Sequence, residues 1–567
     1  MAVNGGRSAG VFAGIVATAG LAVCLLVVAL AEEMGLPEGV TFVVLAGGTL
    51  AAAAGFGLSV PTMRIPDFFA GGRGNGPFHV GLVWVSGVAF MAFFGVTGLD
   101  FTADGDGTAL ILGPMAGLVI AGLTAAPGIR RGEALTLPDH LATRLGGPLV
   151  RPVALAVLVA VGCPLLASVM MAFGRLASHF GFVGHAQAIW VAFVAVLAAT
   201  LLGGARSLVR TQLAQFLVLF VAYLLPALLL ALREYGIPAP SFLVGQTLHA
   251  LGREAAAMPV GVESGTARSA ADSLRYLAIV VWIALATAAL PHLLASAMVL
   301  REARLARPAA AWAAVFSILL FMVAPGYAVF ARATDIGVLA LPRITGMPFF
   351  MSAFLVAGGL AALTAVAAGT ALALANTLAH DFYHRLLDRR APQGRRLLVA
   401  RALVVLIAGG AAWFATASPA APMSLAAAAF SLAVAGLFPV MLASSLWPRL
   451  TATGAAAGMT VGLLAAAAYL IAFRRYGADL TGALALARWA DPAMIAGYFG
   501  LVPGAVVLVG VSLLTERKRD SESGPVVMVG DRSVPSVEER PVRPAVSARP
   551  ALLRIRQTFI RSRLLRR

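Results

Sequence analysis

A few polar side chains stand inside long apolar stretches of the chain, and their types decide what chemistry is available there. They are Ser86, Thr97, Ser168, Gln212 and Thr287. All are neutral hydrogen-bonding groups, which suit the binding of a small solute or ion better than the breaking of covalent bonds. We interpret them, with Gly87, as candidates to line a substrate cavity. The alternative for each is that it packs against a neighbour or bonds its own helix.

No catalytic motif accompanies these groups. The sequence has no Walker A motif, no nucleophile elbow, no H-E-x-x-H and no Cys/His cluster with the spacing of metal ligands. We therefore expect no enzyme, no cofactor and no bound metal beyond a coupling Na⁺. The same absence argues against ATP-driven transport by this chain alone.

The composition identifies the elements that must hold these side chains. Of 567 residues, 60% are hydrophobic and only 12% are charged, and the mean hydropathy is +0.90. A soluble chain needs about a quarter of its residues charged, and two cysteines, Cys24 and Cys163, cannot staple a disulfide scaffold of this length. The chain is therefore a polytopic membrane protein.

Fourteen segments are long and apolar enough to span a membrane, which takes about 20 residues of helix. They are 10–31, 38–60, 78–99, 108–127, 150–178, 184–203, 208–232, 274–298, 310–332, 348–379, 400–417, 422–446, 454–473 and 494–514. Uninterrupted runs without ten-residue alternation favour helices over a barrel. The predicted fold class is all-α, with about 14 transmembrane helices.

The net charge of +17 is explained by the side of the membrane on which the arginines fall. With the N-terminus inside, the inner connections and the tail are rich in arginine, whereas the outer connections carry slightly more acid than base. This is the positive-inside pattern of a multi-pass plasma-membrane protein with a cytoplasmic C-terminus. We expect membrane lipids and no nucleic acid as partners.

Each end of the chain leaves two interpretations open. Segment 10–31 ends in Ala29-Leu30-Ala31, so it is either a retained helix, which we favour, or a cleaved signal peptide. The tail, 515–567, carries apolar residues at helical spacing among arginines near its end. It forms either an amphipathic helix on an anionic leaflet or a solvated basic tail.

Glycine and proline inside three spans could mark the broken helices that carriers use to bind solutes. They are Ser86-Gly87 in the third span, Gly162-Cys163-Pro164 in the fifth and Gly358-Gly359 in the tenth. The alternative is that such small residues only let helices pack closely.

Ionisable groups inside a membrane are costly and usually functional. Asp100, at the outer end of the third span, is our candidate proton site, and Arg175 could pair with it or attract an anion. The alternative for Asp100 is a solvated interfacial carboxylate. We interpret His292, beside Pro291, as a structural hydrogen-bonding group.

Several motifs resemble those of the sodium:solute symporter family. Pro66-Asp67-Phe68-Phe69-Ala70-Gly71-Gly72-Arg73 is similar to its D-[YF]-[YF]-x-[AG]-G signature. Further matches, similar to the cation/acetate symporter branch, follow in order at 93–102, 106–107, 290–294, 379–383, 438–439, 445–447, 450–451 and 454–455, and again at 559–562.

The resemblance implies a five-plus-five inverted-repeat (LeuT-type) core and cation-coupled uptake of a small organic anion, a short-chain monocarboxylate such as acetate. It implies two peripheral helices in 1–60, the core and one following helix in 61–475, a last helix in 476–514 and a basic tail in 515–567. The oligomeric state stays open.

Carried over residue by residue, the family's sodium site falls on the carbonyls of Val85, Val88 and Ala362. Its hydroxyl pair falls on Ala365 and Val366, which have none, and Thr364 lies about 100° away around the helix. Ala286 and Ala289 replace glycines of the eighth span, so we expect a drier site and a helix less ready to unwind. The coupling ion, Na⁺ or H⁺, stays open.

Three functions remain. We favour a secondary symporter. The alternative from another class is a transport-deficient relative that acts as a sensor or accessory membrane subunit, motivated by the missing hydroxyls. A channel is weaker, because no ring of filter carbonyls or charges is recognisable.

Overall fold

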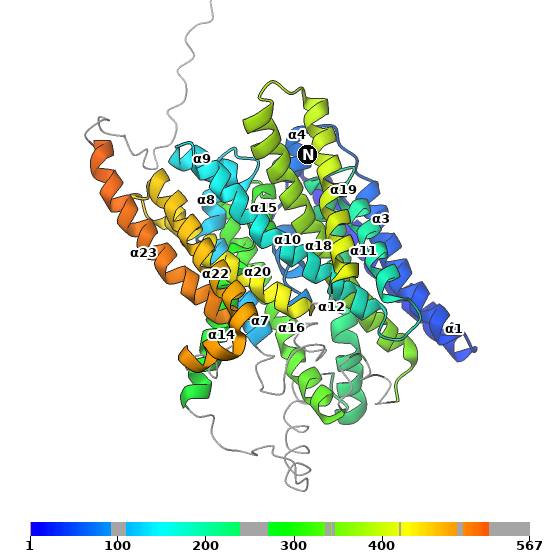
Figure 1. Ribbon diagram of the computed structural model, residues 1–567. Coiled ribbons are helices and arrows are strands. Elements are labelled where there is room, and N and C mark those ends of the chain that lie inside the picture. Colours follow the sequence, from blue (N-terminus) through cyan, green and yellow to red (C-terminus); the bar gives the residue numbers. More distant parts are fainter. Residues whose placement is uncertain are drawn as a thin grey trace, which may run out of the picture. The chain divides into compact units, whose positions relative to one another are not determined.

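The computed structural model describes residues 2–91, 109–238, 270–334, 339, 342, 346–418, 421–484 and 492–520. Met1–Glu516 forms one compact unit and Arg517–Arg567 a second; all contacts below lie within the first. Its described part is built of helices, with Asn75–Leu300 as a single isolated bridge (Figure 1).

The N-terminal half holds α1 (Ala2–Glu33), α2 (Glu38–Phe42), η1 (Val43–Gly47), α3 (Gly48–Leu58), α4 (Ile65–Ala70), η2 (Gly71–Arg73), α5 (Pro77–Ser86), α7 (Ala109–Leu123), α8 (Ala125–Arg131), α9 (Leu137–Leu145), α10 (Val150–Ala177), α11 (His185–Thr200) and α12 (Ala205–Tyr235). The C-terminal half holds α14 (Ala270–Ala289), α15 (Pro291–Ser296), η4 (Ala297–Val299), η5 (Ala303–Leu305), α16 (Ala306–Thr334), α18 (Phe349–Thr377), η7 (Leu378–Leu387), α19 (Gln393–Ala417), α20 (Pro422–Gly436), α21 (Phe438–Leu446), α22 (Ala452–Leu484) and α23 (Pro492–Asp520).

Ten stretches of the described chain are helical, long and apolar enough to cross a membrane, or eleven if the bent pair α14 and α15 with η4 makes one span. The described part of each of the fourteen predicted segments is mainly helical, but the count of fourteen is not confirmed. Two segments are too short as helices, since α5 has 10 residues and α11 has 16. The segment 10–31 lies in α1, whose first side chains lie outside the described residues.

Two of the spans are interrupted. The α14–α15 pair bends by 46° at Leu290, which is extended (φ −62°, ψ 128°) because a residue before proline avoids the helical region. Pro291 thus breaks this span even though Ala286 and Ala289 replace glycines. In the third span, α5 ends at Ser86 and a turn follows at 87–89.

The two other predicted breaks are absent from the structure. Helix α10 runs unbroken through Pro164 from Val150 to Ala177, and α18 runs unbroken past Gly358 and Gly359. A carbon added at Gly358 would lie 2.5 Å from Cβ of Ala222. Close packing, and not unwinding, therefore accounts for the glycine at this position.

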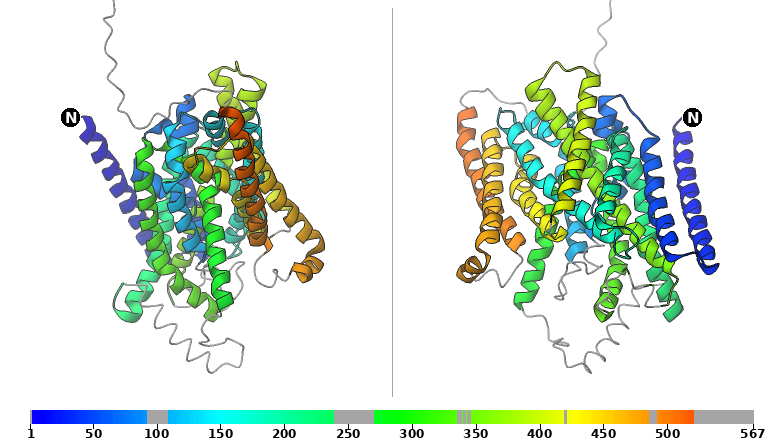
Figure 2. Two further views of the ribbon diagram at one scale, coloured as in Figure 1. Left: turned by 90° about the vertical axis from the view of Figure 1, so that its left-hand side faces the viewer. Right: turned by 45° about the vertical axis from the view of Figure 1, so that its right-hand side comes forward.

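Helix α18 is the centre of the unit. The most apolar stretch of this span is wholly buried, and α18 contacts α10, α11, α12, α15 and α19. At its start the carboxylate of Glu32 accepts the backbone N–H groups of Phe349 (2.6 Å) and Phe350 (2.8 Å). Helix α1, seen in dark blue along one side in Figure 2, is thereby joined to the central helix by two hydrogen bonds.

Candidate transport site

The two helix breaks meet. Nε2 of His292, at the start of α15, lies 3.1 Å from the carbonyl oxygen of Gly87, just after α5. The approach is close, because a carbon added at Gly87 would lie 2.7 Å from Cδ2 of Leu293. Segments far apart in sequence are therefore joined directly where each helix is interrupted.

Hydrogen-bond partners and burial together decide the protonation of His292. A carbonyl only accepts, so Nε2 carries a proton. The ring is 5% exposed and pairs with no carboxylate in the described part of the chain, which disfavours a second proton, so Nδ1 accepts from the hydroxyl of Thr370 on α18 at 3.3 Å. This tautomer is assigned from the partners. The neutral imidazole joins α5, α15 and α18, as the structural interpretation of His292 requires.

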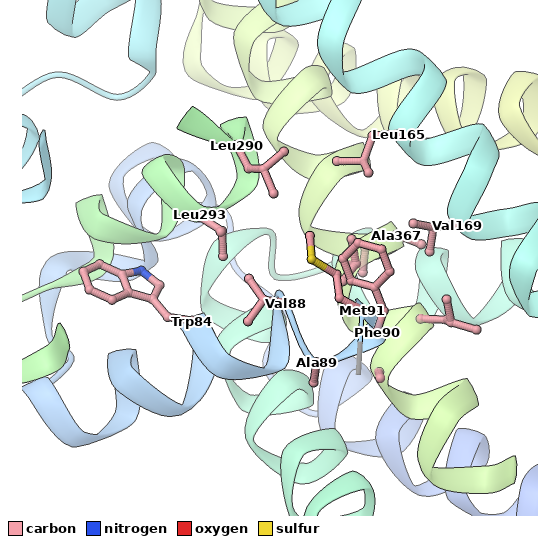
Figure 3. Close-up of a cluster of buried hydrophobic side chains, with 14 of the residues drawn as sticks. Trp84, Val88, Ala89, Phe90, Met91, Leu165, Val169, Leu290, Leu293 and Ala367 are labelled. Atoms are coloured by element: carbon pink, nitrogen blue, oxygen red, sulfur yellow. The ribbon is translucent and has the colours of Figure 1, made fainter. Parts of the chain in front are cut away.

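The residues after the first break face apolar neighbours. Val88, Ala89, Phe90 and Met91 are all buried. Figure 3 shows them beside Leu290 and Leu293 from the other break, Leu165 and Val169 from α10, and Ala367 from α18. The surroundings of the break are therefore apolar.

The oxygen atoms predicted to bind a cation are already held in hydrogen bonds or in regular helix. The carbonyl of Val85 accepts the N–H groups of Val88 (3.0 Å) and Ala89 (2.8 Å), and that of Val88 accepts the N–H of Met91 (3.0 Å). Ala362 lies in unbroken α18. The Thr364 hydroxyl donates to the Leu360 carbonyl (2.7 Å).

A small cavity lies beside this meeting point, with about 40 Å³ of space for the centres of water-sized molecules. It is bounded by α4, α5, α12, α15, η4 and α18, and its polar lining consists of Gln212, His292, Ser296 and Asn376. Gln212, predicted as a cavity residue, donates Nε2 to the carbonyl of Ala365 (3.0 Å). Its amide thus contacts the position where the family's site has a hydroxyl.

Asn376 and Phe69 line the same cavity, and the sequence-based prediction missed both roles. Asn376 is an amide within the alanine-rich helix α18, and its Oδ1 is buried without a hydrogen-bond partner in the described part of the chain. A polar residue in so apolar a helix was the available signal. Phe69 belongs to the recognised signature, but nothing in the signature indicates a cavity.

The other predicted residues do not line this cavity. Ser168 donates to the carbonyl of Pro422 (2.6 Å), joining α10 to α20. Thr287 packs against Gly117 of α7, where an added carbon would lie 2.5 Å from its Cβ. Ser86 is fully buried. Arg175 lies half-buried in the last turn of α10. Thr97 and Asp100 lie outside the described residues.

A second polar cluster joins the loop helix α9 to a recognised motif at 379–383. Arg151 of α10 contacts the carboxylates of Asp139 (2.9 Å) and Asp381. Asp381 also accepts the hydroxyl of Thr136, and Nε2 of His380 lies 3.4 Å from Asp139. Residues Leu137–His140 of the loop helix are thus held against the Ala379–Tyr383 motif at the end of the central span.

Electrostatics explain why the buried carboxylate of Asp139 stays charged. Burial by itself raises the pKa of Asp139, but the hydrogen bond and charge of His380 and the hydrogen bond of Arg151 outweigh it, so that the pKa lies below its usual range. Ligand atoms of Asp139, His380 and Asp381 lie within 4.8 Å of one another. Because the guanidinium of Arg151 already pairs with Asp139 and Asp381, we assign no metal there.

Interrupted helices that meet inside an apolar helical bundle are typical of secondary transporters. Residues 68–462 match the Sodium:solute symporter family, and the chain belongs to it. The family indicated by the motifs is confirmed, whereas the acetate branch stays a prediction.

Two similar proteins illustrate the relationship. An uncharacterized symporter of Cupriavidus necator is 25% identical, over 83% of this chain and 90% of its own. A solved structure of a Na⁺-coupled sialic acid symporter, substrate-bound and outward-open, has a TM-score of 0.64 at 14% identity and covers 84% of this chain and 98% of that one. At that identity the second similarity shows the fold alone.

Proposed function

We propose that the protein is a secondary active symporter that couples Na⁺ or H⁺ to the uptake of a short-chain monocarboxylate such as acetate. The observation that carries the transport mechanism is the bond between Gly87 and His292, which places two helix breaks face to face. Breaks of this kind supply unpaired backbone groups to a ligand near the membrane centre. The monocarboxylate is supported by the motif resemblance.

The broken helices explain how binding can be linked to movement. For a cation to reach the carbonyls of Val85 and Val88, the turn bonds that occupy them must open. Opening this turn also displaces the neighbouring Gly87, whose carbonyl is bonded to His292. Ion binding and the separation of the two breaks are therefore coupled in this proposal, with Ala362 and Thr364 as the ligands from α18.

The remaining predicted groups keep their proposed roles. Gln212 belongs to the substrate cavity, with Ser86, Gly87, Thr97, Ser168 and Thr287 as groups that a different conformation would expose. Asp100 and Arg175 form the proposed proton or anion site. We place the protein in the plasma membrane with its C-terminus in the cytoplasm, on the arginine distribution alone.

The test is uptake of labelled acetate by proteoliposomes at pH 8, where roughly one acetate molecule in a thousand or fewer is undissociated and diffuses passively. An inward Na⁺ gradient and an inward H⁺ gradient are imposed separately, and protein-free liposomes give the background. We expect one gradient to accelerate uptake. Gln212→Ala should reduce it, whereas Ser424→Ala, at an exposed serine of α20, should not. Uptake that ignores both gradients contradicts symport.

The second candidate, a transport-deficient sensor or accessory subunit, is favoured by one observation. Ala365 and Val366 provide no hydroxyls, and the hydroxyl of Thr364 is bonded to its own helix. Saturable acetate binding without any gradient-driven uptake distinguishes this candidate from the symporter.

A further inference from the structure

The cavity beside the helix breaks has a neutral polar lining. Gln212, Ser296 and Asn376 carry no charge. His292 is 5% exposed and pairs with no carboxylate in the described part of the chain, so burial favours its neutral imidazole. The lining residues that the structure describes include no Asp, Glu, Lys or Arg.

The charged and titratable groups on the surrounding elements face elsewhere. Asp67 of α4 pairs with Arg206 of α12 at 3.2 Å. Arg210 of α12 and His79 of α5 are exposed, and neither lines the cavity. Helix α18 contributes no ionisable side chain between 349 and 377, and His292 is the one titratable group of α15 and η4.

Most of the hydrogen-bonding capacity of the lining is already used. Gln212 donates to Ala365 (3.0 Å). Ser296 donates to the carbonyl of Leu293 (2.6 Å) and accepts Nε1–H of Trp84 (2.7 Å). The exception is Asn376, which is 6% exposed and has an Oδ1 without a partner among the described residues. A ligand in the cavity therefore meets a primary amide.

A primary amide complements an undissociated carboxylic acid better than a carboxylate. It offers one acceptor and donors side by side, and a carboxylic acid offers an O–H donor beside a carbonyl acceptor, so both can be satisfied. A carboxylate only accepts and leaves Oδ1 unpaired. It would also be buried without a countercharge, which is strongly unfavourable.

The oxygen atoms at the position expected for sodium also favour an uncharged solute without a bound cation. The carbonyl of Ala365 is bonded to Gln212, and the hydroxyl of Thr364 is bonded to Leu360. Neither oxygen is held ready for a cation in this conformation.

We infer that this cavity takes its solute uncharged, as an undissociated short-chain carboxylic acid or an amide of the same shape, with Asn376 as the recognising residue. The inference rests on the proposed function for the monocarboxylate class and deepens it. The carboxylate takes up a proton from water on one side of the membrane, crosses as the acid and returns the proton on the other side. H⁺, carried by the solute, is then the coupling ion.

The test is equilibrium binding of acetate and of acetamide to the purified full-length protein by calorimetry between pH 5.5 and 7.5, in sodium and in choline buffers. The undissociated fraction of a carboxylic acid falls about tenfold per pH unit above its pKa of about 4–5. We expect the affinity for total acetate to fall by about tenfold per unit. Acetamide affinity should stay constant, and sodium should change neither.

Substitutions test which residue binds the probes and whether the solute or the protein carries the proton. Asn376→Ala should weaken both probes, whereas Ser424→Ala should weaken neither, after size-exclusion chromatography has shown that each variant is folded. In His292→Gln the pH dependence of acetate binding should persist, because the solute carries the proton. A pH dependence that disappears in this variant would place the proton on the imidazole and overturn the inference.

The remaining outcomes separate this inference from the proposed function. Acetate binding that is independent of pH, that requires sodium, or that is not matched by acetamide overturns the uncharged solute, while gradient-driven uptake would still support symport. Failure of both probes to bind overturns the inference for this cavity. Absence of uptake under either gradient contradicts the proposed function itself.

Discussion

Arg151 on α10 and Asp381 at the end of the central span form a buried ion pair across 230 residues of sequence. The guanidinium also holds Asp139 of the loop helix α9. One arginine therefore pairs with two carboxylates whose side chains are 0% and 5% exposed. Through it, the loop helix, α10 and the end of the central span are fastened together.

Removing the arginine should be more damaging than removing either carboxylate. Arg151→Met leaves two buried carboxylates facing each other, and breaking a buried pair in this way costs about 3–5 kcal/mol. Asp381→Asn should cost less, because Arg151 keeps Asp139 and the amide oxygen still accepts from Thr136. Thermal unfolding of the purified protein measures both.

The matched control is Arg304→Met. Arg304 pairs with Glu302, but its side chain is 80% exposed, and exposed pairs contribute about 1 kcal/mol or less. If Arg151→Met and Arg304→Met lowered the melting temperature equally, the buried cluster would have no structural role.

Glu32 should stabilise the central helix from its N-terminal end. Its carboxylate accepts hydrogen bonds from the first two N–H groups of α18, which have no partner within the helix. Its negative charge also interacts favourably with the positive end of the helix dipole. We expect Glu32→Ala to lower stability by about 1–2 kcal/mol.

Glu33→Ala is the comparison for this helix cap, since Glu33 is the exposed neighbour on the same helix. It should leave the melting temperature unchanged. Equal effects of the two substitutions would show that α1 does not support α18 through this contact.

Local sequence patterns predicted the helices and one of the breaks for clear physical reasons. Apolar runs of about 20 residues can only be helical in a membrane, and the break predicted at Ser86-Gly87 is where α5 ends. The break at Pro291 was not predicted, since that span was expected to be less ready to unwind; Pro291 forces an extended Leu290 all the same. The same logic over-predicted a break at Pro164, because a proline inside a well-packed helix is tolerated when neighbouring helices surround it.

The side-chain partners could not be predicted in this way. Asp381 stood in a recognised motif, but its partner Arg151, which it shares with Asp139, is defined only when α9, α10 and the end of the central span are assembled. Gln212 was identified because it is an amide in an apolar span. Asn376, which is equally polar, was missed, since nothing local shows which helix faces enclose the cavity.

His140 should make the protein less stable in mild acid. Burial and the charge of Arg144 lower its pKa to about 4, against the opposing effect of Asp139. Between pH 6.5 and 4 the unfolded chain binds a proton that the folded protein excludes, so stability falls as pH falls through this window. The shift corresponds to about 3 kcal/mol at most.

Melting temperatures at pH 7 and pH 5 test this effect. His140→Gln removes the titrating group and should show a smaller loss of stability on acidification than the parent protein. Asp139 stays ionised over the whole interval, because its pKa lies below its usual range. It therefore adds nothing to the change of stability between pH 7 and pH 5. An identical loss in parent and variant would assign the acid sensitivity to other groups.

Gly358 should be required for the contact between α12 and α18. A methyl group added there would lie 2.5 Å from Cβ of Ala222 and 3.3 Å from Cα of Leu219, so Gly358→Ala forces the two helices apart at a cost of about 1–3 kcal/mol. Gly410→Ala in α19 meets nothing within 4 Å and should instead stabilise by about 0.5–1 kcal/mol, because alanine favours the helix.

Rescue distinguishes this contact from a general intolerance of α18 to change. Ala222→Gly removes the atom that the new methyl group would strike, so the double variant Ala222→Gly, Gly358→Ala should recover most of the melting temperature lost by Gly358→Ala alone. Additive losses would mean that the two positions do not touch. In that case the close approach of α12 to the central helix would be wrong.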